Sequence, residues 1–280
     1  MHPVYVHIKK ELSPFYAEEE ASAMAKWISS DILHLSTLEL YTGKDMNFST
    51  KEWAELEDIL RRLKQREPLQ YILQEASFCR MSFHVEQGVL IPRPETEELV
   101  EWIVSDYREA GQVRILDIGT GSGCIPVSLA QLLPEAQVSS CDVSAEALRI
   151  AATNVKRYGD KVTLFCADIL KEELPECQVE VLVSNPPYIT ESERTDMEAN
   201  VLDWEPELAL FVPDSDPLRF YRRIARKGLD WLSEGGALYF EINRAYGAET
   251  VRMLEALGYR QIELRKDLSG NDRMIKAIRP

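Results

Sequence analysis

From Val113 to the end of the chain, short apolar segments alternate with longer segments of helical periodicity, and this alternation constrains the fold more than any other feature. It is typical of a parallel sheet whose strands are joined by crossover helices. We expect strands at 113–118, 137–142, 162–167, 179–184, 237–242, 260–266 and 273–279. We expect helices at about 124–133, 144–158, 216–233 and 245–257. This part of the chain is therefore predicted to be an α/β domain with a Rossmann-like sheet.

Residues 1 to about 75 follow a different pattern, in which apolar residues recur at helical spacing. One helix is expected from about 17 to 35. Ser49-Thr50-Lys51-Glu52 has the spacing of a capping box, with Ser49 as the N-cap of a further helix. The residues on one face of that helix are Trp53, Leu56, Ile59, Leu60 and Leu63. We therefore expect a small helical domain that ends near Pro68.

The segment between the two parts is expected to form a short β-hairpin at about 76–91. The proline-containing segment 91–97 that follows is stiff, because proline fixes the backbone angle φ. It leads into a helix that we expect to begin at about Thr96 and to end before Gly111. The hairpin would thus link the helical domain to the α/β domain.

Charge and hydropathy exclude several classes of protein. The 280 residues carry a formal net charge of −15 at pH 7, whereas proteins that track a nucleic-acid backbone carry a basic face. The basic segment 61–66 lies at the end of a predicted helix, where cations favour the helix dipole. No apolar run approaches the length that spans a bilayer, and the N-terminus lacks the pattern of a signal peptide. We expect a cytoplasmic protein without direct nucleic-acid or membrane contact.

Cysteines and histidines give no indication of a disulfide framework or a metal site. The five cysteines are scattered and contain no C-x-x-C pair, and the four histidines form no spaced ligand pair. Cys141 and Cys166 lie in apolar, strand-like segments and are expected to be small core residues.

A glycine-rich turn follows the first predicted strand of the α/β domain. The sequence runs Asp117-Ile118-Gly119-Thr120-Gly121-Ser122-Gly123 and then enters a helix. Glycines at such a turn allow a ligand to approach the backbone, and the helix presents free N–H groups. The dinucleotide pattern G-x-G-x-x-G would need glycine at Cys124, and no Walker sequence is present. The turn therefore predicts a cofactor site that is not committed to a pyrophosphate.

Acidic residues follow the second and third predicted strands. Asp142 is suited to bind both hydroxyls of a ribose, because Ser144 is available to cap the next helix. Asp168 is suited to accept an exocyclic amino group of a base, on which Ile169 would pack. A solvated acid in a turn is the alternative for each carboxylate. Since the carboxyl ends of parallel strands meet at one edge of a sheet, we expect these residues to lie close together.

The fourth predicted strand is followed by the sequence Asn185-Pro186-Pro187-Tyr188. Such a loop is suited to bind a planar NH2 group while its nitrogen is alkylated. The lone pair of such a nitrogen is delocalised, so the group must be held by its hydrogens. The Asn185 side-chain oxygen can accept one N–H, and the Pro186 carbonyl can accept the other. Two prolines stiffen the loop, and the Tyr188 ring can stack on the planar group. An ordinary proline-rich turn is the alternative.

With these motifs the chain resembles the class I S-adenosylmethionine-dependent methyltransferases, and more narrowly the PrmC/HemK-type release factor glutamine methyltransferases. The resemblance rests on residues 66–72, 90–97, 117–123, 185–189, 205–210, 235–242 and 266–273. The segments 91–97 and 267–273 are more specific than 185–188, which nucleic-acid amino methyltransferases share. One departure is Val212–Pro217, where the family tends to have a glycine-rich turn.

The resemblance implies a helical substrate-binding domain at 1–75, a β-hairpin linker at 76–91 and a seven-stranded catalytic domain at 92–280. It implies methyl transfer to N5 of the glutamine in the Gly-Gly-Gln motif of class I peptide chain release factors, during translation termination. Asn185, Pro186, Pro187 and Tyr188 would hold that glutamine, with Asn185, Pro186 and Tyr188 as catalytic residues. The residues that would bind the cofactor are Asp117, Gly119, Thr120, Gly121, Ser122, Gly123, Asp142, Asp168, Ile169 and Asn185.

We expect direct transfer from the sulfonium methyl to the amide nitrogen, without a strong base. Two alternatives remain. One is a DNA or RNA amino methyltransferase, which the net charge disfavours. The other is a non-catalytic cofactor-fold binding protein, which the intact 185–188 loop disfavours.

Overall fold

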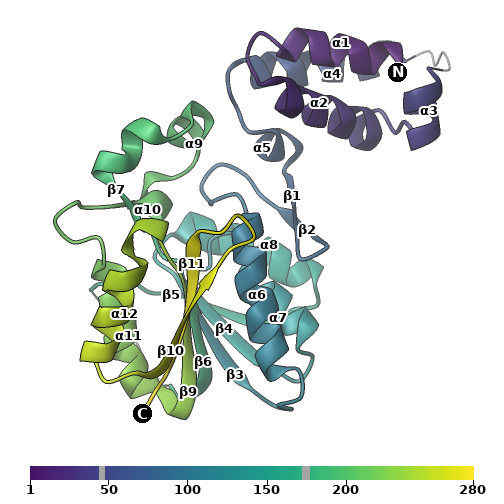
Figure 1. The fold of residues 1–280 in the computed structure, drawn as a ribbon. Coiled ribbons are helices and arrows are strands. Elements are labelled where there is room, and N and C mark those ends of the chain that lie inside the picture. Colours follow the sequence, from purple (N-terminus) through teal and green to yellow (C-terminus); the bar gives the residue numbers. More distant parts are fainter. Residues whose placement is uncertain (44–47, 172–176) are drawn as a thin grey trace. The chain divides into compact units, whose positions relative to one another are not determined.

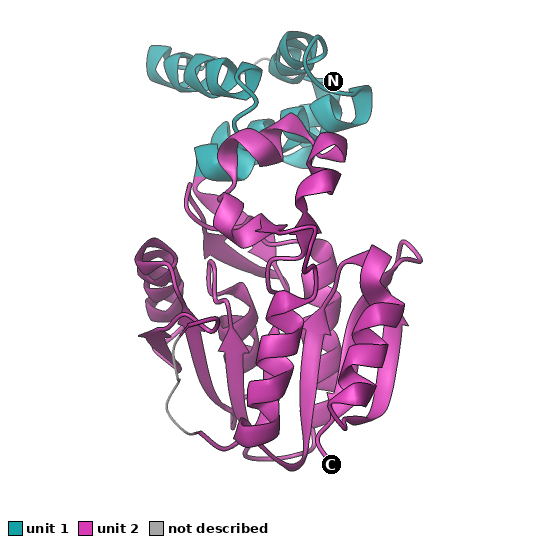
Figure 2. Ribbon diagram, turned by 90° about the vertical axis from the view of Figure 1, so that its left-hand side faces the viewer, with its two compact units in different colours: residues 1–73 teal, residues 74–280 magenta. Residues whose placement is uncertain are grey.

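The computed structural model describes residues 1–43, 48–171 and 177–280, and the chain forms two compact units, Met1–Leu73 and Gln74–Pro280 (Figure 2). The predicted hairpin belongs to the second unit. Among the residues that the structure describes, no helix is long and apolar enough to cross a lipid bilayer.

Unit 1 consists of short helices around its own apolar core. They are α1 (Pro3–Leu12), α2 (Glu18–Trp27), the π-helix η1 (Ile28–Ile32), α3 (Thr37–Thr42), α4 (Thr50–Lys64) and α5 (Leu69–Leu73). The predicted helix at 17–35 is thus shorter and ends in a π turn. The fully buried side chains of the core include Ile8, Leu12, Ile28, Leu60 and Leu63.

The capping box that begins α4 is confirmed, since the Ser49 and Glu52 side chains each accept a hydrogen bond from the other's backbone N–H. The predicted buried face of α4 is correct for Leu56, Ile59, Leu60 and Leu63. Trp53 belongs to the same predicted face, but it is 39 % exposed. Trp53 lies in the first turn of α4, where Phe48 and His7 make edge-on contacts with it.

Unit 2 contains a seven-stranded sheet, as predicted (Figure 1). The order of its strands is β10-β11-β9-β6-β3-β4-β5. Its strands are β3 (Arg114–Ile118), β4 (Gln137–Asp142), β5 (Val162–Cys166), β6 (Val179–Ser184), β9 (Leu232–Glu241), β10 (Arg260–Lys266) and β11 (Asp272–Ile278). Strands β5, β4, β3, β6 and β9 pair in parallel, whereas β11 is antiparallel to both β9 and β10. The carboxyl ends of β3, β4, β5, β6 and β9 therefore share one edge.

Helices cover both faces of this sheet (Figure 1). One core cluster joins α6 (Pro94–Tyr107), α7 (Cys124–Leu132) and α8 (Ala145–Arg157) to the sheet. A second cluster joins α11 (Arg219–Trp231) and α12 (Gly247–Ala256) to it. The central strands are buried on both faces, which explains their nearly continuous apolar sequences.

Smaller elements complete unit 2. The hairpin is β1 (Glu75–Phe78) paired with β2 (Met81–His84), so it ends earlier than the predicted residue 91. An excursion between β6 and α11 contains β7 (Ile189–Thr190), η2 (Glu191–Asp196), α9 (Ala199–Trp204), α10 (Glu207–Leu210) and β8 (Phe211–Val212). A further 3-10 turn, η3 (Arg244–Tyr246), precedes α12.

Three local expectations are corrected. Helix α6 begins at Pro94 rather than Thr96, because proline is favoured in the first turn, where no N–H is needed. Leu232 and Ser233 belong to β9 and not to the preceding helix. Cys141 is buried as expected, but Cys166 is exposed at the end of β5, the terminal strand of the sheet.

Close packing of α11 on the sheet gives a stability prediction at Gly228. Alanine normally stabilises a helix interior relative to glycine by about 0.5–1 kcal/mol. Here a Cβ atom would lie 2.4 Å from the Tyr259 hydroxyl and 3.2 Å from a methyl of Leu182. Overpacking of this kind costs about 1–3 kcal/mol, so Gly228→Ala should lower the free energy of unfolding, measured by chemical denaturation. Tyr259→Phe should recover part of the loss in the Gly228→Ala background, and a variant as stable as the parent would contradict the packing argument.

Candidate active site

The polar residues predicted at the strand ends do lie along one edge of the sheet. Strands β6, β3, β4 and β5 are consecutive neighbours, and all are parallel. The segments that follow them are the glycine turn after β3, Asp142 at the end of β4, Asp168 after β5 and Asn185 after β6. The register pairs Ile118 with both Cys141 and Ser184, so the strands end nearly level.

The glycine turn needs glycine for its backbone conformation. Gly119, Gly121 and Gly123 have φ values of 87°, 51° and 83°, a region that other residues rarely adopt. A Cβ at Gly119 or Gly121 would meet nothing within 4 Å, so the space beside these residues is open. At Gly123 a Cβ would lie 3.2 Å from that of Ala151 in α8. The first two glycines therefore leave room beside the backbone, whereas the third also allows close helix packing.

Asp142 holds the glycine turn in place. One carboxylate oxygen accepts the Gly121 N–H at 2.9 Å, and the other accepts the Ser144 N–H at 2.9 Å. Ser144 caps α8 as predicted, by accepting from the Ala147 N–H at 3.2 Å. Burial raises the pKa of Asp142, while the two backbone N–H groups favour its ionised form. Each oxygen still has a second lone pair, so binding of a diol remains compatible with these contacts.

Buried polar atoms without partners cluster around the same turn. Asp117 is fully buried, and one of its oxygens accepts the Ser140 hydroxyl at 2.5 Å. Within the part of the chain that the structure describes, neither its other oxygen nor the hydroxyls of Thr120 and Ser122 have a partner with the geometry of a hydrogen bond. The Thr120 hydroxyl is nevertheless close enough to Asp117 to favour its ionised form. Burial raises the pKa of Asp117 to about 7. Since unpaired buried polar groups are costly, these atoms fit a polar, positively charged ligand.

Asp168 and Ile169 are less clearly directed at a ligand. Burial tends to raise the pKa of Asp168, but the Lys171 ammonium and the Leu170 N–H hold it below its usual value. The distances are 3.1 Å to Lys171 and 2.9 Å to the Leu170 nitrogen. Ile169 is 7 % exposed and packs into the core on the α11 side. It therefore offers little surface on which a base would pack.

The side chains of the 185–188 loop are held by residues far away in the sequence. The Asn185 side-chain nitrogen lies 3.2 Å from the Thr96 hydroxyl, and the Tyr188 hydroxyl donates to Glu241 at 3.0 Å. The Tyr188 backbone carbonyl accepts a hydrogen bond from the Asn243 side chain at 3.0 Å. Burial, and then the Glu241 carboxylate, raise the pKa of Tyr188 well above its usual value. Tyr188 therefore stays protonated and cannot serve as a base.

Glu241, at the end of β9, is the functional candidate that the sequence reasoning missed. It is 1 % exposed, and its carboxylate accepts the Thr96 hydroxyl at 2.6 Å as well as that of Tyr188. Burial raises the pKa of Glu241, while these hydroxyls and the charge of Arg273 favour its ionised form. The available signal was a carboxylate inside the apolar run 237–242 of a central strand.

The 267–273 motif connects β10 to β11 and contacts the residue that follows Glu241. Arg273 pairs with the buried Asp267 at 3.2 Å and also donates to the Ile242 carbonyl at 3.3 Å. Asp267 accepts the Asn271 N–H at 2.9 Å, which closes the loop between β10 and β11. The motif thus places the charge of Arg273 near enough to Glu241 to favour its ionised form.

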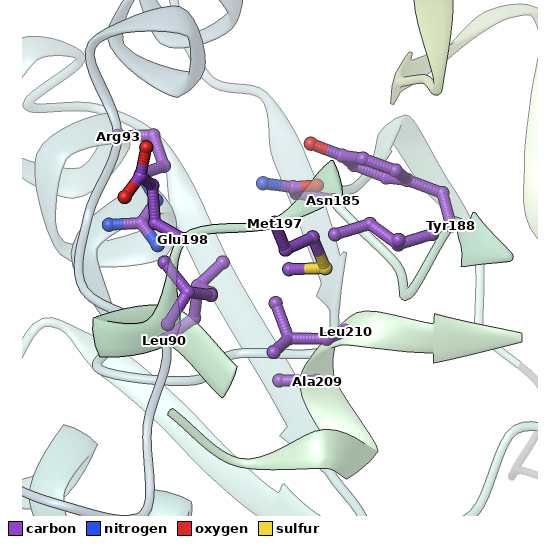
Figure 3. A pocket seen from close by; sticks show the side chains of 10 residues that line it. Leu90, Arg93, Asn185, Tyr188, Met197, Glu198, Ala209 and Leu210 are labelled. Carbon is purple, nitrogen blue, oxygen red and sulfur yellow. The ribbon is translucent and has the colours of Figure 1, made fainter. Parts of the chain in front are cut away.

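Asn185 and Tyr188 line a pocket of about 230 Å³ (Figure 3). Its lining residues are Leu90, Arg93, Asn185, Tyr188, Ile189, Met197, Glu198, Val201, Ala209 and Leu210. Arg93 forms an ion pair with Glu205, which also accepts the Ile91 N–H at 3.0 Å. This contact joins the motif segments 91–97 and 205–210 in one wall, a role that the sequence reasoning did not assign.

The segment Val212–Pro217, where the family tends to have a glycine-rich turn, contacts the residues that follow the 185–188 loop. Strand β8 pairs in parallel with β7, directly after the 185–188 loop. Asp214 accepts the Ser192 N–H at 3.0 Å, and Asp216 pairs with Arg222 at 3.0 Å.

Comparisons with known proteins agree with this geometry. Residues 5–73 match the model of the PrmC N-terminal domain, and residues 96–203 match that of the methyltransferase small domain. A protein of Bacteroides thetaiotaomicron named release factor glutamine methyltransferase is 49 % identical over the full length of both chains. Proteins of the same name from Flavobacterium psychrophilum and Streptococcus pneumoniae are 42 % and 37 % identical, covering 95 % and 92 % of this chain and 94 % and 91 % of their own.

Solved structures share the fold at low sequence identity. The hMettl16 catalytic domain in complex with an RNA hairpin aligns with a TM-score of 0.55 at 15 % identity, over 84 % of this chain and 83 % of its own. A methyltransferase from Pyrococcus furiosus aligns with a TM-score of 0.51 at 14 % identity, over 82 % and 98 %. These similarities support a methyltransferase fold, and the curated relatives define the family more narrowly. The chain therefore belongs to the release factor glutamine methyltransferase family.

Proposed function

We propose that this protein methylates the side-chain amide nitrogen of the glutamine in the Gly-Gly-Gln motif of class I peptide chain release factors. The observation that carries the proposal is the pocket beside Asn185 and Tyr188, at the sheet edge that also bears the glycine turn. The proposal includes a cytoplasmic location and no direct contact with nucleic acid or membrane. Unit 1, which matches the PrmC N-terminal domain, is proposed to contact the folded release factor.

The residues of the glycine turn fit S-adenosylmethionine, the cofactor of this family. Asp117, Thr120 and Ser122 offer buried oxygens for which the described residues supply no hydrogen-bond partner, and Asp142 offers two oxygens for a ribose. Asp168 and Asn185 are proposed to complete the cofactor site, and Ile169 to contribute only its small exposed part. When bound, S-adenosylmethionine supplies a methyl group on a positively charged sulfur.

The protein's own contribution to catalysis is position and electrostatics. The Asn185 oxygen and the Pro186 carbonyl would accept the two N–H groups of the glutamine amide. These contacts become stronger as the nitrogen acquires positive charge, so they favour the transition state over the ground state. Tyr188 would pack on the planar amide while its hydroxyl stays bound to Glu241. Apolar side chains such as Leu90 and Leu210 would exclude water from the pocket.

Removal of the Asp142 carboxylate should weaken cofactor binding. Asp142→Ala would remove the acceptor of the Gly121 N–H together with the proposed ribose contact. Hydrogen bonds to charged groups contribute about 1.5–3 kcal/mol, so we expect affinity for S-adenosylmethionine to fall by about one to two orders of magnitude in calorimetric titration. Asp230→Ala, which removes an exposed acid from α11, is the control for net charge. Equal affinity in both variants would refute the assignment of Asp142.

Replacement of Asn185 should impair turnover. Asn185→Ala should lower kcat by roughly 10²-fold or more, by analogy with the loss of one oriented transition-state hydrogen bond. The measurement is a steady-state methylation assay at saturating release factor and cofactor. Near-normal turnover in this variant would mean that the loop is not the reacting site.

Mass spectrometry identifies the substrate directly. A class I release factor incubated with the protein and S-adenosylmethionine should gain a single methyl group at the glutamine of its Gly-Gly-Gln motif. DNA and RNA in parallel reactions with radiolabelled cofactor should remain unlabelled, because a net charge of −15 repels polyanions. Label on nucleic acid with an unmodified glutamine would replace the proposal with a nucleic-acid amino methyltransferase.

A further inference from the structure

We propose that Glu241, acting through Thr96, is a positioning residue that sets which end of the Asn185 side-chain amide is presented to the substrate. The inference rests on the proposed function and deepens it. It explains why the site would select an N–H donor, such as the glutamine amide, over an isosteric group without one.

The argument begins with the direction of the hydrogen bonds. A carboxylate can only accept hydrogen bonds. The Thr96 hydroxyl, 2.6 Å from a Glu241 oxygen, therefore uses its single proton to donate to Glu241. The Thr96 oxygen is then left with lone pairs towards Asn185, at 3.2 Å. The group of Asn185 that can meet these lone pairs is its NH2, so the amide oxygen is left for the substrate.

Burial makes this direction difficult to reverse. Glu241 and Thr96 are 1 % and 3 % exposed, so water has little access to replace either partner. The other Glu241 oxygen is occupied by the Tyr188 hydroxyl at 3.0 Å. Burial raises the pKa of Glu241, whereas the hydrogen bonds from the Thr96 and Tyr188 hydroxyls and the charge of Arg273 favour its carboxylate form. One buried charge thus orients two residues of the 185–188 loop.

The consequence is a selection between glutamine and glutamate. An Asn185 oxygen attracts the N–H of a glutamine amide, whereas it repels the oxygens of a glutamate carboxylate. A reversed Asn185 amide would present its NH2 and favour glutamate instead. Buried polar groups left unpaired discriminate strongly in this way.

The test compares Thr96→Val, which removes the hydroxyl at nearly constant shape, with Thr96→Ser, which retains it. We expect Thr96→Val to lower kcat by roughly 10- to 100-fold, the effect of a misplaced catalytic group, and Thr96→Ser to restore most of the rate. Thr96→Val should also bind a Gly-Gly-Glu release factor variant better than the parent does, in competition with the Gly-Gly-Gln form.

A matched control separates positioning from stability. Thr250 of α12 is also fully buried, and its hydroxyl donates at 2.8 Å to the carbonyl of Tyr246, the N-cap of that helix. Thr250→Val should therefore lower the melting temperature without changing kcat or the selection of glutamine over glutamate.

A combination of variants tests whether Glu241 acts through Thr96. In the Tyr188→Phe background, Glu241→Leu and Thr96→Val combined should lower kcat no more than either does alone, because Glu241 would reach Asn185 only through the Thr96 hydroxyl.

A readout without substrate distinguishes this inference from the proposed function. In protein with 15N-labelled asparagine, the Asn185 NH2 signals, identified by their loss in Asn185→Ala, should shift in Thr96→Val and return in Thr96→Ser. Unchanged signals and equal rates in Thr96→Val and Thr250→Val would overturn the inference. If the Asn185 NH2 signals move in Thr96→Val and return in Thr96→Ser as expected, but the release factor is not methylated, the proposed substrate is refuted and the positioning role stands.

Discussion

The buried Glu241 carboxylate is the interaction on which the geometry of the site depends. It connects Thr96 of α6 and Tyr188 of the loop after β6 to the end of β9, three segments far apart in the sequence. A buried charge costs several kcal/mol unless it is paired and hydrogen-bonded. The two hydroxyls and the nearby Arg273 meet that requirement. The same contacts therefore stabilise the carboxylate and orient the loop.

At the cofactor side of the sheet edge, by contrast, several buried polar groups have no hydrogen-bond partner among the described residues. Asp117 is fully buried and Asp142 is half-buried, and burial raises the pKa of each. Oxygens of Asp117, Thr120 and Ser122 have no hydrogen-bond partner among the described residues. The Asp142 carboxylate and these unpaired oxygens are groups that a polar, positively charged ligand would compensate. The Asn185 NH2 and the Tyr188 hydroxyl are thus held by the protein itself, whereas the turn after β3 has buried oxygens left for a ligand.

Much of this arrangement was predictable because parallel strands deliver their following residues to one edge. That rule brought Gly119–Gly123, Asp142 and Asn185 together correctly. The sequence did not predict how exposed a residue is where that depends on packing against other segments. Trp53 lies on the predicted face of α4 but is partly exposed, and Cys166 is exposed because β5 is a terminal strand.

Sequence alone determined the α/β pattern, the strand ends that carry polar residues and the family. Those features depend on local periodicity and on short motifs. Tertiary structure alone decided that Thr96, Asn185, Tyr188 and Glu241 form one hydrogen-bonded chain. It also joined Arg93 to Glu205 in the pocket wall. These hydrogen bonds join residues that are 145 positions (Thr96 and Glu241) and 89 positions (Thr96 and Asn185) apart. Their direction has no local sequence pattern, since it arises from the packing of α6 against the sheet beside β9.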